Sequence, residues 1–319
     1  MSTRSRAAEA DRAAVAFHLA LVRIGAQAAA EALALWRTYP VNGSPSASKS
    51  FINAALILVS RRRREARQLA RAYYRLIRAL HTGRTISDPG KRETRVTLGS
   101  LRDDFMELAP TYAADTDGDS DVLPVDSVPS LSDAAADQAF RDEALTTITA
   151  LGPDALDKAN GKLDPNDPAS QVDAERQAAH DQAGADVAAD VSRLVQDGAR
   201  AELWDKTQRD PRAVGYIRLS RTGTPCGFCA MLISRGPVYK SSKAAGGDGY
   251  NEGDLYHRNC NCYSEPIFSI PDYKTNPRYA LNREYEALWP EVTKGYSGKD
   301  ALNAWRRYIR TQTASQADA

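Results

Sequence analysis

Five side chains in the C-terminal third of the chain have the types and spacing of metal ligands. Cys226 and Cys229 form a C-x-x-C pair, and His257, Cys260 and Cys262 form an H-x-x-C-x-C group. Two residues between thiolates allow both sulfur atoms to reach one ion at about 2.3 Å while the backbone turns. Because tetrahedral zinc takes four ligands, one of the five is in surplus. We prefer Cys226, Cys229, His257 and Cys260, with Cys262 as the competitor for the last position.

The grouping of all four cysteines within 37 residues favours a metal over disulfides. We expect no export signal, because Glu9 and Asp11 interrupt what would be a basic leader, and disulfides are rare in proteins that stay in the cytosol. Disulfides formed after oxidation and ordinary buried thiols remain as alternatives. A catalytic zinc keeps an open coordination position beside a base, whereas five candidate ligands favour a closed site. The sequence therefore predicts structural Zn²⁺ that cross-links a small domain with a thin core.

The elements around this cluster change character at about residue 205. A strand is expected at 214–219, where Val214, Tyr216 and Leu219 follow Pro211. A final helix is expected at 298–312. Its apolar face is formed by Leu302, Trp305, Tyr308 and Ile309.

The upstream sequence is mainly helical. Residues 7–38 and 50–82 predict two long helices that pair antiparallel, since such helices need a packing partner to be stable. Gly83 follows the second helix as its expected C-cap residue. Further helices are expected at 97–112, 133–151 and 169–203. The segments 113–132 and 152–168 are rich in Asp, Ser, Pro and Gly and are expected to be exposed linkers.

The charge of the chain is divided by region. Residues 1–100 hold 18 Lys/Arg against 6 Asp/Glu, residues 101–200 hold 7 against 22, and residues 201–319 hold 17 against 13. This division indicates separately exposed segments. We expect a mainly α protein with a small C-terminal α+β zinc-stapled domain, and an N-terminal long-helix region joined to it by acidic linkers. The expected regions are helical 1–112 with a basic helix, acidic 113–204, and metal-binding 205–319.

One predicted helix carries a row of arginines with a single acid, Glu65. Recurrence every three or four residues places most of them in a stripe beside the apolar face, which is typical of sequence-independent contact with the DNA backbone. The alternative, which we favour, is a solvated face or a face paired with the acidic middle of the same chain. The row consists of Arg61, Arg62, Arg63, Arg64, Arg67, Arg71, Arg75 and Arg78.

Alternating aspartates in the first linker imitate a calcium-binding loop. The sixth position of that loop is Ser120 instead of glycine, and no convincing helices flank it closely, so an acidic, disordered linker is the better interpretation. The aspartates are Asp115, Asp117, Asp119, Asp121 and Asp126.

Neither an enzyme nor a membrane protein is predicted. The chain has no G-x-S-x-G, H-E-x-x-H or P-loop motif, so catalytic residues are not assigned. The richest apolar run, 13–22, stops at Arg23 and is far shorter than the ~20 residues that cross a bilayer. We expect a soluble, intracellular protein.

The residues around the cysteines resemble the phage Mu F-like minor head proteins, in particular those of tailed phages of actinobacteria. The resemblance is carried by TPCGFCAML at 224–232, SRGPVY at 234–239, YHRNCNC at 256–262, and Pro266. The family pattern is a C-x-x-C followed, after a variable insert, by His-Pro-Asn-Cys-x-Cys and a short strand that contains proline. Arg258 stands here where proline is usual. The resemblance covers about residues 200–270, and the helical region before it matches only in general layout.

This resemblance implies a minor capsid protein of head morphogenesis, made beside the portal protein and present in few copies. It would assist procapsid assembly near the portal or DNA delivery. Its partners would be the portal protein, other head or scaffold proteins, and packaged DNA. Its location would be the capsid interior or portal vertex, and the host cytoplasm during assembly. The alternatives are a zinc-stapled nucleic-acid-binding protein and, with less support, a head-maturation protease or zinc hydrolase.

Overall fold

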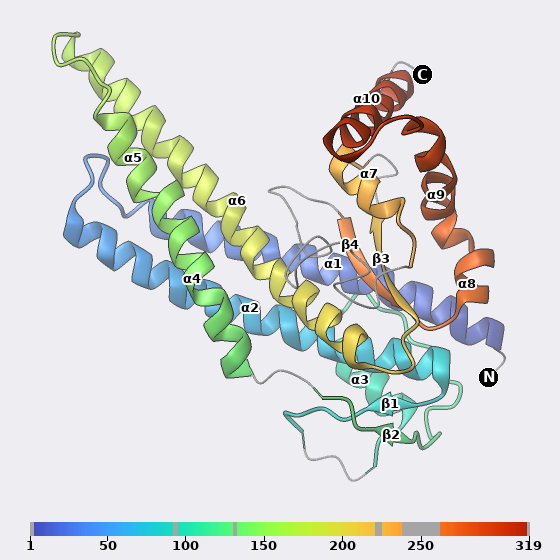
Figure 1. Cartoon of the computed structure of the whole chain (residues 1–319). Helices are drawn as coiled ribbons and strands as arrows, with labels where there is room; N and C mark the ends of the chain where they lie inside the picture. The colour runs from blue at the N-terminus through green and yellow to red at the C-terminus, as the bar shows by residue number, and fades with distance from the viewer. Residues whose placement is uncertain (1–2, 92–94, 130–132, 221–224, 238–261, 318–319) are drawn as a thin grey trace.

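The computed structural model describes residues 3–91, 95–129, 133–220, 225–237 and 262–317, and it is mainly helical with a few short strands (Figure 1). The elements of the N-terminal and middle parts are α1 (Thr3–Trp36), α2 (Pro45–Thr82), β1 (Thr85–Ile86), α3 (Leu98–Leu108), β2 (Val125–Asp126), α4 (Asp133–Leu151), α5 (Pro153–Asn160) and α6 (Ala169–Arg209). Those of the C-terminal part are β3 (Gly215–Ser220), α7 (Gly227–Ile233), β4 (Cys262–Ile267), α8 (Ile270–Thr275), η1 (Pro277–Tyr279), α9 (Ala280–Val292) and α10 (Gly298–Ala317).

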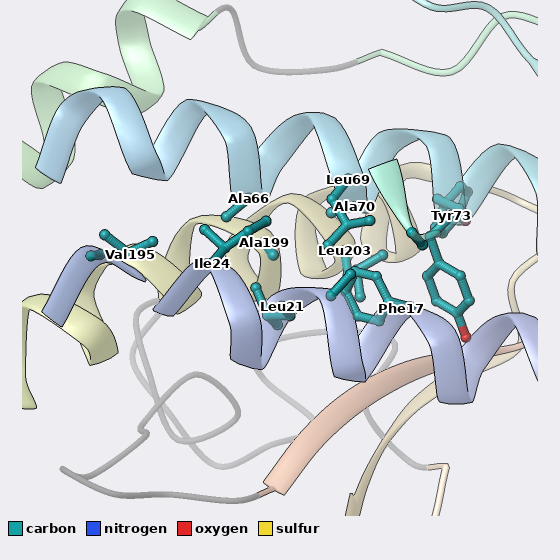
Figure 2. Close-up of a cluster of buried hydrophobic side chains, with 14 of the residues drawn as sticks. Phe17, Leu21, Ile24, Ala66, Leu69, Ala70, Tyr73, Val195, Ala199 and Leu203 are labelled. Atoms are coloured by element: carbon teal, nitrogen blue, oxygen red, sulfur yellow. The ribbon is translucent and has the colours of Figure 1, made fainter. Parts of the chain in front are cut away.

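Three long helices, α1, α2 and α6, form the body of the protein. Helices α1 and α2 run antiparallel, as expected, and α6 lies along both of them (Figure 1). Figure 2 shows their apolar side chains meeting between the three axes. The ring of Phe17 in α1 stacks on that of Tyr73 in α2 with 4.4 Å between centroids, and Leu203 of α6 is fully buried beside them. One core cluster extends from Ala10 to Tyr216, and the division of the chain into three regions stays a prediction.

Helix α2 has clear stop and start signals in its sequence. The Ser44 hydroxyl accepts a hydrogen bond from the Ala47 N–H, and Pro45 occupies the first turn, where its missing N–H costs nothing. At the other end Gly83 adopts φ 69°, and its N–H donates to the Ala79 carbonyl. A left-handed residue of this kind favours glycine. The prediction of Gly83 as the C-cap is confirmed.

Helix α1 is long and apolar enough to cross a membrane by length and composition alone, over Ser5–Trp36. The count of consecutive apolar residues, which stopped at Arg23, missed this property and was wrong on this point. More than half of the most apolar window is buried inside the protein. The packing of α1 against α2 and α6 accounts for this composition, because a helix buried on several sides is apolar on several faces.

A buried ion pair joins the C-terminal ends of α2 and α6. The Arg78 Nε lies 2.6 Å from Asp210 Oδ2, and both side chains are completely inaccessible to solvent. Arg78 also donates to Asp126 Oδ2 at 2.7 Å and to the Thr85 carbonyl at 3.1 Å, while the Tyr74 hydroxyl donates to Asp210 at 2.9 Å. The guanidinium thereby fixes α6 and both strands of the β1–β2 pair to α2 at one point.

The acidic segment after α3 is exposed over most of its described residues, as the sequence predicted, but it is anchored to the protein at several points. Val125 and Asp126 pair in parallel with β1, and Leu123 and Val128 belong to the main core cluster. Its aspartates bind arginines of the N-terminal region, as in Asp115–Arg12 at 2.7 Å and Asp119–Arg102 at 2.6 Å. The amino-acid composition of this segment suggested a linker. It does not reveal the ion pairs that anchor the segment, because their arginines lie elsewhere in the sequence.

The C-terminal part is built on an antiparallel pair, β3 and β4, with Ser220 opposite Cys262. The strand expected at 214–219 and the helix expected at 298–312 are both confirmed, as β3 and α10. The sequence did not predict α5, which lies in the second supposed linker, nor α7, α8 and α9. Helices of six to thirteen residues offer too few turns for an apolar period to stand out.

Replacement of Asp210 by Asn tests the buried ion pair. We expect the free energy of unfolding to fall by about 3–5 kcal/mol, because a buried guanidinium loses its charged partner. Urea unfolding followed by circular dichroism measures the change. Asp103→Asn, an exposed position of α3, is the matched control and should change stability by less than about 0.5 kcal/mol. Equal stability of the two variants would contradict the central role of the pair.

Candidate metal centre

Three of the five predicted metal ligands lie in the described part of the chain. Cys226 is exposed at the start of α7, Cys229 is buried in its first turn, and Cys262 is the buried first residue of β4. His257 and Cys260 lie outside the described residues. Among the described residues, no three His, Cys, Asp or Glu side chains converge as metal ligands. The full ligand set therefore stays a prediction.

The fold places Cys229 and Cys262, one residue from each half of the cysteine motif, in the same cluster. Cys229 and Cys262 belong to one buried apolar cluster although 33 positions separate them in the sequence, and only 1% and 3% of their surfaces are exposed. Cys226 caps α7, and its Sγ accepts the Cys229 N–H at 3.5 Å. The C-x-x-C pair is thus held on a helical turn whose buried side chains share a cluster with Cys262, the first residue of β4. Soft sulfur donors from two elements are the chemistry that suits zinc.

Gly227, inside the C-x-x-C pair, is required by the close approach of α10. A Cβ atom added at Gly227 would lie 2.8 Å from the Arg306 Cγ and 3.2 Å from the Arg306 Cα. Real Cβ atoms essentially never approach a neighbour more closely than 3.0 Å. The structure therefore assigns this glycine to the packing of α7 on α10.

The wall of the site is an aromatic and aliphatic cluster. Trp305 is fully buried and packs edge-on against Tyr285 of α9, with 5.5 Å between ring centroids. Burial raises the pKa of Tyr285 to about 12, so this phenol stays neutral at physiological pH. Leu302, Tyr308 and Ile309 complete the apolar face of α10, as the sequence predicted. These side chains shield Cys229 and Cys262 from water.

The arginine row of α2 is largely paired with acids of the same chain. Arg67 and Arg71 both bind Glu202 of α6, at 3.2 and 2.9 Å. Arg75 lies 3.5 Å from Asp104 and donates to the Ile86 carbonyl at 3.0 Å. Together with Arg78, these side chains hold α3, α6 and the β1–β2 pair to α2.

The first arginines of the row divide between paired and exposed. Arg61 and Arg62 form ion pairs with Glu31 of α1. Arg63 is buried, donates to the Leu194 carbonyl at 2.7 Å and lies over the ring of Phe140. Arg64 is exposed, and its Nε donates to a backbone carbonyl one turn earlier. Nucleic-acid binding by α2 stays a prediction, and it now depends on Arg61 and Arg64.

The electrostatics of these pairs follow from their surroundings. Hydrogen bonds from Arg84 and Arg78 hold the pKa of Asp126 well below its usual range. Burial alone would raise the pKa of Asp210, but hydrogen bonds from Arg78 and the backbone outweigh it, so the pKa is lowered. Burial lowers the pKa of Arg63 to about 10, which still leaves it charged at neutral pH. The contacts of Arg78 with Asp126 and Asp210 are therefore ionised pairs at neutral pH.

Comparison with known proteins finds similarity to phage proteins. A family model described as VG15 protein matches residues 131–289, just under half of the chain. The Gene 15 protein of Mycobacterium phage D29 is 26% identical in an alignment of 156 residues that covers 37% of this chain and 56% of that protein. Both matches support a phage protein family. No solved structure matches the chain.

The VG15 match runs from α4 to α9 and includes all five candidate ligands. It ends before α10 and does not reach α1, α2 or α3. The chain spans 56% of the length of its curated relative. The similarity thus covers the acidic middle and the cysteine-bearing part, and it leaves the arginine-rich helix outside.

Gly227→Ala tests the contact between the cysteine turn and α10. We expect destabilisation by about 1–3 kcal/mol, because the added methyl group overpacks a junction made partly of backbone. Thermal unfolding followed by circular dichroism measures it. Gly161→Ala is the control, because that residue has φ −68° and room for a Cβ at ordinary contact distance. A Gly227→Ala protein as stable as this control would show that α10 does not lie against the turn.

Proposed function

We propose that this protein is a minor component of a tailed-phage head that acts in procapsid assembly near the portal. The observation that supports this is the match to VG15 proteins over 131–289, because that span contains the cysteine motif that resembles Mu F-like minor head proteins. The similarity to a mycobacteriophage protein agrees with the actinobacteriophage type of the motif. Its partners would be the portal protein and other head or scaffold proteins. Its location would be the virion, after assembly in the host cytoplasm.

We further propose that its cysteine cluster binds structural Zn²⁺. Cys226 and Cys229 would provide two ligands from α7, and His257 and Cys260 the others, with Cys262 as the alternative fourth ligand. Bound zinc would supply a cross-link between α7 and the chain that enters β4. Burial of Cys229 and Cys262 in an apolar cluster supports a staple over a reaction centre, because a substrate needs access to a catalytic metal. We therefore propose no enzymatic activity.

The head assignment predicts that the polypeptide is a constituent of the particle. Mass spectrometry of purified virions and of procapsids should detect it in few copies relative to the major capsid protein. Virions treated to remove adsorbed host proteins provide the control. Absence from both particles, in a lysate that contains the protein, would contradict the assignment.

The zinc assignment predicts close to one zinc per chain by elemental analysis of the purified protein. Chelation should lower the unfolding temperature, because binding energy of the metal contributes to folding. Cys229→Ser should lose the metal. Ser264→Ala, a buried position on the same β-strand as Cys262, should keep it and controls for disturbance of the strand.

The variant Cys262→Ser distinguishes the two possible ligand sets. If the variant retains zinc, His257 and Cys260 are the remaining ligands; if it loses zinc, Cys262 is a ligand. A protein that is folded without metal, and whose cysteines are joined in disulfides, would overturn the zinc proposal. That result would leave the head assignment unaffected.

A further inference from the structure

Helix α10 carries a group of cations whose charged ends form no ion pair with other described residues. Arg306, Arg307 and Arg310 are exposed, as is Lys299 in the first turn. Asp300 is the single acidic residue in the whole α10 sequence. Within the described chain none of these four cations lies within ion-pair distance of an acid, and the Arg310 Nε donates to the Arg306 carbonyl of its own helix. The arginines of α2, in contrast, are mostly occupied by Glu31, Glu202, Asp104 and Asp210.

The four cations share one face of the helix. Lys299, Arg306 and Arg310 follow one another at seven and four positions, so they form a row, and Arg307 lies on its flank. At 1.5 Å per residue the row is roughly 16 Å long. That length corresponds to roughly five nucleotides of one strand at 3.4 Å of axis each. The spacing suits a phosphate backbone.

The opposite face of α10 holds this row in place. Trp305 and Ile309 are buried in the cluster that contains Cys229, and Ala301 and Ala304 are buried as well. The helix lies away from the α1–α2–α6 body, near the C-terminal end of the described chain (Figure 1). The cations therefore lie on the exposed face of a peripheral helix whose other face is packed against the protein. An extended partner can reach this exposed face.

We propose that α10 is a binding surface for the phosphate backbone of double-stranded DNA. Guanidinium groups match phosphate oxygens in bidentate geometry, and unpaired arginines reach them without first losing another partner. A lipid surface is disfavoured because the apolar face of α10 is buried in the protein, whereas a membrane-binding helix inserts that face. This inference rests on the proposed function as a head protein. It assigns the contact with DNA to α10 instead of α2.

The test measures binding of the full-length chain to two unrelated 30-base-pair DNA duplexes by fluorescence anisotropy over a series of salt concentrations. We expect equal affinity for both sequences and a slope of log K against log salt of about −3 to −4, from four phosphate contacts. The triple variant R306Q/R307Q/R310Q should reduce the slope to about −1 and weaken binding at least tenfold. Glutamine keeps the Cβ and Cγ of Arg306 that pack over Gly227.

The matched control is R61Q/R64Q on α2, which should bind DNA as the unchanged protein does. Circular dichroism verifies that the variants are folded, and R307Q/R310Q, which leaves the Gly227 contact intact, gives a second reading if the triple variant is unfolded. Unaltered binding by a folded α10 variant, loss of binding in the α2 control, or binding to phosphatidylserine vesicles but not to DNA would each overturn the proposal. DNA binding through α10 by a protein absent from virions would contradict only the head assignment.

Discussion

The buried pair between Arg78 and Asp210 is the constraint on which the arrangement of the two parts of the chain depends. Asp210 is the residue at which α6 ends, five positions before β3 begins. Because Arg78 binds it from α2 and also binds Asp126 and the Thr85 carbonyl, one guanidinium sets the end of the long-helix body, the β1–β2 pair and the exit of the chain toward β3. Buried charges are stable only when every partner is in place, so this node favours a single arrangement.

Ion pairing between distant parts of the chain also explains the uneven distribution of charge along the sequence. Bases of the first hundred residues pair with acids of the second hundred, as Arg12 does with Asp115, Arg75 with Asp104 and Arg78 with Asp126. Regional charge therefore reflects internal pairing more than separately exposed segments. Helix α10 carries four exposed cations, Lys299, Arg306, Arg307 and Arg310, on the face opposite its aliphatic and aromatic core.

The C-terminal part is organised by an apolar cluster and by the close contact between α7 and α10. One apolar cluster contains both Cys229 and Cys262, and the absence of a side chain at Gly227 allows α10 to approach the C-x-x-C turn. A metal bound there would join elements that already pack together. Its cross-link and the cationic face of α10 would then depend on the same small core, centred on Trp305.

By itself, the sequence determined the long helices α1, α2, α4 and α6, the strand β3 and the apolar face of α10, because long periodic patterns and caps such as Gly83 are local signals. It also determined the ligand types of the cysteine cluster, since C-x-x-C spacing is set by covalent geometry. Only the tertiary structure decided that the acidic segment is anchored to the protein, that the α2 arginines are internal, and that Gly227 serves the α10 contact. Those outcomes depend on partners that are not sequence neighbours, such as Glu202 for Arg67, 135 positions away, and Arg306 for Gly227, and no local pattern encodes such a pairing.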